Sequence, residues 1–173
     1  MTDASEAAPA AGRPSGQWVL LSYRLPREPS TPRITIWRKL KRLGVAQISD
    51  GLIALPADAR TREHLDWIAD EIGEVGGTAT VWHAQPASRH QERQLAQAMA
   101  DARAAEYRAV LAEATTARGL APGERSRTMR KLRAELRRIH RRDYFPPPEK
   151  HAATTAVNAL HPDHEPSEKD TAS

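Results

Sequence analysis

The run QWVLLSYRLP, residues 17–26, is a short apolar and aromatic stretch that ends at a proline. Such a run is typical of a strand that is buried in a sheet. The following PREPSTP, residues 26–32, predicts a loop, with Ser30 or Thr31 as the N-cap of a helix and Pro32 in its first turn. We therefore expect a strand followed by a helix at the start of the ordered chain.

The helix after this loop is amphipathic. It is expected to end at Leu43, because Gly44 suits the left-handed conformation that closes many helices. At about 100° per residue, one broad face collects the apolar side chains, which are Ile34, Ile36, Trp37, Leu40 and Leu43. The opposite face carries Arg38, Lys39 and Arg42, and Lys41 flanks it. The stretch WRKLKRLG, residues 37–44, is thus predicted to pack through one face and to present cations on the other.

Three further elements complete a first domain. VAQISDGLIALP, residues 45–56, predicts two short strands around the Ser-Asp-Gly turn, or one long strand with a bulge at the glycine. ADARTREHLDWIADEIGEVGG, residues 57–77, predicts a helix with an apolar face, and TATVWHAQ, residues 78–85, predicts a last strand. The order β-α-β-β-α-β over residues 17–87 indicates an α+β fold with a ferredoxin-like arrangement, in which two helices cover one face of a four-stranded antiparallel sheet.

The C-terminal half reads as a helical hairpin over residues 88–145. Residues 88–118 are Ala-rich and helical, GLAPGE at 119–124 predicts a turn, and the second helix is expected over 125–144. Its apolar residues recur at 3-4-3 spacing, as Met129, Leu132, Leu136 and Ile139. The prolines at 146–148 are expected to end the hairpin, and residues 1–16 and 146–173 are predicted to be disordered tails, the second one acidic.

Composition excludes several classes of protein. The chain of 173 residues has no cysteine, so disulfides, thiolate catalysis and Cys-based zinc sites are ruled out. The N-terminal segment has no apolar core of signal-peptide type, and no run reaches the roughly 18 apolar residues of a membrane span. We therefore expect a soluble cytoplasmic protein without membrane contact, with its main core in residues 17–87, where all four tryptophans lie.

The charge is concentrated in the second half of the hairpin. Residues 118–142 hold ten cations against Glu124 and Glu135, a local balance of +8, whereas the whole chain has a net charge of +4. Such an excess, mostly of arginine, favours a polyanion such as the backbone of duplex DNA. The candidate phosphate-binding residues are Arg38, Lys39, Arg42, Arg130, Arg133, Arg137, Arg138 and Arg141.

Two alternatives use the same cations. They can form a solvated surface, or they can dock on acidic stretches such as residues 63–74 or 163–170, in this chain or in a dimer mate. The chain would then be a protein-interaction or oligomerisation subunit. Clustered arginines could also bind a small inorganic dianion directly.

No motif indicates an enzyme. The patterns GxSxG, GxxxxGK[ST], GxGxxG and HExxH do not occur, and nothing assembles a nucleophile with a base. His151, His161 and His164 fall in the predicted tail without a second group of ligands, so we expect no catalytic residue, no metal and no cofactor.

The chain resembles the N-terminal region of the chromate resistance protein ChrB over roughly residues 17–147. The resemblance is carried by P-S-x-P-R at 29–33 with W-R-K-L-K-R-L-G at 37–44, by D-G-x-x-x-L-P at 50–56, and by R-R-x-x-R-R-D-[YF]-F-P at 137–146. It implies a ferredoxin-like core related to the repressor PaaX and to the small CRISPR adaptation nuclease. It also implies a transcriptional regulator that releases promoter DNA when chromate is present.

Two departures limit what the resemblance implies. Full-length members have a further C-terminal domain, whereas a tail is expected here after Pro148, so the chromate-sensing part is expected either on another polypeptide or not at all. Nuclease relatives place an aspartate at the end of the first strand, whereas this chain has LLSYRLP there, so nuclease activity is not expected. The expected partners are duplex DNA, a second copy of the chain, and a protein that carries the missing domain.

Overall fold

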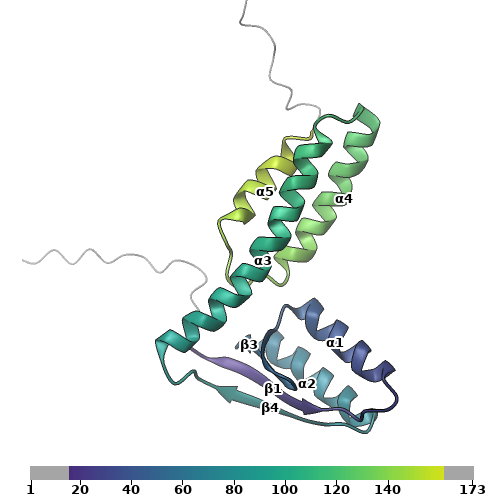
Figure 1. Ribbon diagram of the computed structural model, residues 1–173. Coiled ribbons are helices and arrows are strands. Elements are labelled where there is room, and N and C mark those ends of the chain that lie inside the picture. The colour runs from purple at the N-terminus through teal and green to yellow at the C-terminus, as the bar shows by residue number, and fades with distance from the viewer. Residues whose placement is uncertain (1–15, 162–173) are drawn as a thin grey trace, which may run out of the picture. The chain divides into compact units, whose positions relative to one another are not determined.

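The computed structural model describes residues 16–161 and has an α+β fold with a four-stranded antiparallel sheet and five helices (Figure 1). The chain divides into two compact units, and the boundary along the sequence falls between Ala96 and Gln97. The boundary lies inside α3, which spans Arg89–Ala117. Each unit is described by itself.

The first unit contains the sheet and two helices. The elements follow in the expected order, and the sheet has the strand order β2-β3-β1-β4. Strand β1 is central and pairs antiparallel with β3 and β4, while β2 pairs antiparallel with β3. The bounds are β1 Trp18–Arg24, α1 Thr31–Leu43, β2 Ala46–Ser49, β3 Leu52–Pro56, α2 Ala59–Glu74 and β4 Thr78–Ala84.

Alternation along β1 places its apolar residues in the core. Val19 lies opposite Leu55 of β3, and Leu21 lies opposite Ile53, and all four side chains are fully buried. Both α1 and α2 lie on one face of the sheet (Figure 1), where α1 buries Ile36 and Leu40 and α2 buries Leu65, Ile68 and Ile72.

The helix ends follow local rules. Helix α1 ends at Gly44, which has φ 74° and donates its N–H to the carbonyl of Lys41 at 3.1 Å. Helix α2 begins at the capping box of Asp58 and Thr61, in which the Thr61 N–H reaches Asp58 Oδ1 at 2.7 Å. These caps fix where both helices start or stop on the sheet.

The predicted apolar face of α1 is only partly buried. Ile34 is 48% exposed, so its assignment to the packed face is wrong, and Trp37 is half-buried. The reason is position: both side chains border an open hollow at the end of the sheet, whereas Ile36 and Leu40 are directed into the core.

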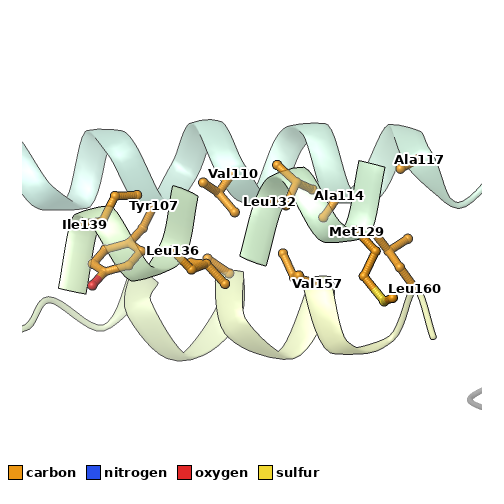
Figure 2. Packing of buried hydrophobic residues seen from close by; sticks show 11 residues of the cluster. Tyr107, Val110, Ala114, Ala117, Met129, Leu132, Leu136, Ile139, Val157 and Leu160 are labelled. Atoms are coloured by element: carbon orange, nitrogen blue, oxygen red, sulfur yellow. The ribbon is translucent and has the colours of Figure 1, made fainter. Parts of the chain in front are cut away.

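The second unit is a three-helix bundle. The C-terminal part of α3 packs with α4 (Pro122–His140) and α5 (Glu149–Asn158), and the apolar side chains of the three helices meet between them (Figure 2). The four residues of α4 predicted from their spacing, which we call the helix seam, are all buried: Met129, Leu132, Leu136 and Ile139.

Helix α5 corrects the prediction that the chain after residue 145 is a disordered tail. Ala153, Val157 and Leu160 are buried against the hairpin. The prolines at 146–148 precede this helix, where their fixed φ is tolerated, and so they do not mark the end of structure. Helix α4 also begins earlier and ends earlier than expected, because it spans Pro122–His140 and not residues 125–144. The remaining predicted tails, residues 1–15 and 162–173, lie outside the described residues.

Candidate nucleic-acid interface

Four arginines of α4 lie on one face of the helix. Arg130, Arg133, Arg137 and Arg141 are spaced by three, four and four residues, which places them within about 80° of one another. Arg141 is the C-cap and keeps helical dihedral angles, φ −64° and ψ −23°, so it continues the row. Among residues 16–161, none of the four has an ion-pair partner. We call these residues the arginine stripe.

The helix seam fixes the direction in which the stripe faces. Leu132 is 1% exposed and Ile139 is fully buried, because both pack against α3 and α5. The stripe lies on a different arc of the same helix, and its side chains are exposed apart from the half-buried Arg133. Burial of the seam therefore holds the guanidinium groups outside the bundle.

Two other cations of α4 have partners. Arg138 pairs with Glu135 at 2.8 Å, and Lys131 pairs with Glu113 of α3 at 2.7 Å. Exposed pairs of this kind contribute about 0–1 kcal/mol, so they partly neutralise the cations without locking them. Arg138, predicted as a phosphate contact, therefore differs from the stripe.

The basic face of α1 also contains both paired and unpaired cations. Lys39 Nζ donates to Glu71 Oε1 of α2 at 2.7 Å, while Arg38 and Arg42 are exposed and unpaired among the described residues. Lys41 lies over the Trp37 ring at 5.3 Å from its centroid. Of the three cations predicted on this face, two keep an unneutralised charge.

The residues just after α4 have a structural role. Arg142 pairs with Glu106 of α3, which also pairs with Arg103 at 2.9 Å. Tyr107 donates its hydroxyl to Asp143 Oδ2 at 2.8 Å, and the Asp143 side chain is fully buried. We call these five residues the clamp, because they fasten the end of α4 to α3.

Two clamp residues, Tyr107 and Arg103, and the neighbouring His140 have shifted pKa values. Burial, followed by the hydrogen bond to Asp143, raises the pKa of Tyr107 well above its ordinary value. Burial lowers the pKa of Arg103, although Glu106 opposes the shift. The pKa of His140, whose ring lies 5.9 Å from that of Tyr107, is lowered by burial and by Lys150. A neutral tyrosine is therefore kept as the donor to Asp143.

Comparison with known proteins now identifies the family. A family model described as Protein ChrB, N-terminal, matches residues 33–119, half of the chain. The chain belongs to the ChrB N-terminal family. It is 31% identical over 137 residues to Protein ChrB of Cupriavidus metallidurans, an alignment that covers 77% of this chain and 42% of that protein. The chain thus spans about two fifths of the length of this curated relative.

In this ChrB N-terminal chain, the clamp clarifies one of the motifs. The R-R-D part of the segment at 137–146 contains Arg141, Arg142 and Asp143, and only the first of these belongs to the stripe. Sequence reasoning counted Arg142 with the cations of a basic helix. On a helical projection, Arg142 lies close to Glu135 and Lys131. Since Lys131 pairs with Glu113 of α3, this position is a sign that Arg142 also faces α3.

The described residues form neither a metal-binding cluster nor a membrane-spanning helix. No three His, Asp or Glu side chains gather to hold a metal within residues 16–161, and His164 of the weak histidine pattern lies outside this range. In the same range, no helix combines the length and apolar character that crossing a membrane requires.

Proposed function

We propose that this chain is a non-enzymatic, cytoplasmic regulatory protein of the bacterial chromate response that binds duplex DNA through helix α4. The observation that carries the proposal is the arginine stripe, whose guanidinium groups lie outside the bundle without ion-pair partners among the described residues. Arginine suits bidentate contact with phosphate oxygens. Membership of the ChrB N-terminal family supports the link to chromate.

The proposed contacts differ in strength. The stripe makes the main phosphate contacts, and Arg38 and Arg42 of α1 add weaker ones. Arg138 and Lys39 contribute less, because each must leave a carboxylate partner to reach a phosphate. Phosphate contacts of this kind position a protein on a duplex without reading its sequence.

The proposal extends to architecture and assembly. A ferredoxin-like arrangement of the first unit is supported by its β-α-β-β-α-β order and by the sheet order β2-β3-β1-β4. We propose a homodimer formed through the sheet, because Trp82 and Ile48 are 53% and 44% exposed.

The test is the salt dependence of binding to duplex DNA from the protein's own upstream region, measured by fluorescence anisotropy. We expect log affinity to fall with log salt, with a slope that loses about 0.9 for each phosphate contact removed. Arg137→Gln should reduce the slope by about one, whereas the matched variant Lys131→Gln, which removes a paired cation of the same helix, should reduce it by less than half as much. Binding that does not change with salt would overturn the proposal.

A second function is that of an interaction subunit that docks an acidic protein on α4. It is favoured by the carboxylates that already engage the neighbouring cations, Glu113 with Lys131 and Glu135 with Arg138. In that case, poly-glutamate would bind in a stripe-dependent manner, while DNA affinity would be the same for the wild type and for Arg137→Gln.

A further inference from the structure

The first unit has a hollow at the end of the sheet where β1 stops. Its volume is about 900 Å³, and it lies among the loop after β1, the start of α1 and the β2–β3 turn. Small-molecule sites in proteins commonly have volumes of about 300–1,000 Å³. The hollow is thus large enough for an organic ligand and larger than a simple inorganic anion requires.

The backbone on one side of the hollow is firmly held. The Tyr23 N–H donates to the carbonyl of Gly51 at 2.7 Å, which ties the β2–β3 turn to β1. Gly51 has φ 74°, and a Cβ at this position would collide with the Tyr23 carbonyl. The wall next to Asp50 is therefore set by backbone geometry.

Three arginines line this hollow: Arg24, Arg27 and Arg33. All three are exposed, and none has an ion-pair partner among the described residues. The lining also includes one carboxylate, Asp50, so the charged side chains leave a balance of +2. Unpaired guanidinium groups around a concavity favour a ligand that carries a phosphate or another anionic group.

The lining also has an apolar and aromatic part. Trp37 is half-buried and Ile34 is 48% exposed, and both border the hollow. Both are apolar side chains of α1 that the core leaves partly uncovered. A tryptophan face at the edge of a cationic hollow can stack on a planar ring.

Tyr23 adds a hydrogen-bond donor to the lining. Burial, followed by Asp50, raises the pKa of Tyr23, while Arg33 opposes the shift. The phenol therefore remains protonated at neutral pH and can donate its proton to a ligand oxygen.

We infer that this hollow is a binding site for a small phosphorylated ligand with a planar ring, of the mononucleotide class. Arg27 and Arg33 hold the phosphate, and Trp37 contacts the ring. The inference does not rest on DNA binding by α4, because every residue of the hollow belongs to the first unit.

Isothermal titration calorimetry of the full chain tests the inference with AMP, adenosine and inorganic phosphate as probes. Since the ring and the phosphate are held by different side chains, AMP should bind at least about tenfold more tightly than either of the other probes. Equal affinity for AMP and inorganic phosphate would reduce the site to a simple anion patch and overturn the inference.

Three variants locate the site. Arg33→Gln and Trp37→Leu should each weaken AMP binding about tenfold, whereas Asp50→Asn should strengthen it a few-fold because a like charge is removed. Arg60→Gln, an exposed arginine of α2 outside the hollow, is the matched control and should leave the affinity unchanged.

Two further results would overturn the inference. One is the absence of AMP binding up to about 1 mM. The other is binding of a single-stranded oligonucleotide without any binding of AMP, which would make the hollow part of a nucleic-acid surface. The DNA proposal survives either result, because its readout is the salt slope of the α4 variants.

Discussion

The helix seam and the arginine stripe occupy the same helix, α4, but they depend on different neighbours. The seam is held by residues of α3 and α5, and its side chains are almost completely buried. The stripe is positioned by the geometry of the helix itself, and its side chains have no ion-pair partner in the part of the chain that the structure describes. Residues that stabilise the bundle and residues available to a partner thus alternate within a few positions of one another.

The contrast is sharpest at the end of the helix. Arg141 belongs to the stripe, whereas Arg142 turns to Glu106 in the clamp, and its side chain is only 19% exposed. One residue corresponds to about 100° around a helix, which is enough to separate a surface cation from a structural one. The number of arginines in a segment therefore overstates the charge that is available for binding.

The largest effect is expected in the seam. Leu132→Ala should lower the free energy of unfolding by about 3 kcal/mol, because it leaves a cavity between the three helices. Urea denaturation followed by circular dichroism measures the change. A loss below about 1 kcal/mol would show that the bundle collapses around the missing side chain.

The stripe should show the opposite behaviour. Replacing Arg130, Arg133, Arg137 and Arg141 together by Gln should weaken duplex DNA binding about a hundredfold at low salt, since four phosphate contacts are lost. The melting temperature should change little, because exposed charges contribute little to stability. A variant that melts well below the wild type would contradict the separation of the two faces.

The clamp should behave like the seam. Asp143→Ala should cost about 2 kcal/mol of stability, because it leaves the buried Tyr107 hydroxyl without its acceptor. Combining it with Tyr107→Phe should cost less than the sum of the two single changes, which a double-mutant cycle in urea can measure. Additive costs would show that the two side chains act independently.

The smallest effect is that of Tyr107→Phe, about 1 kcal/mol at neutral pH. The folded-state pKa of Tyr107 is raised above 10.0, so its contribution is fully present below pH 10.0 and is lost as the pH rises further. The wild type should therefore lose more stability than the variant between neutral pH and the range above 10.0. Parallel pH profiles of the two proteins, measured by urea denaturation, would contradict a buried, protonated tyrosine.

Much of the fold could be predicted from local patterns. The apolar run QWVLLSYRLP predicted the first strand, Gly44 predicted the end of α1, and the 3-4-3 spacing predicted the helix seam. Helix α5 was missed because three prolines before it resemble a stop signal and its buried side chains are mostly small. Short Ala-rich helices gain their stability from packing, which a local pattern does not reveal.

By itself, the sequence determined the element order of the first unit, the seam of α4, the excess of arginine and the likeness to ChrB N-terminal domains. Only the tertiary structure decided which cations remain unneutralised. Lys39 is paired with Glu71 and Arg142 with Glu106, partners that lie 32 and 36 residues away. The physical reason is that an ion pair acts over a few ångströms in space, and folding alone brings such distant side chains together.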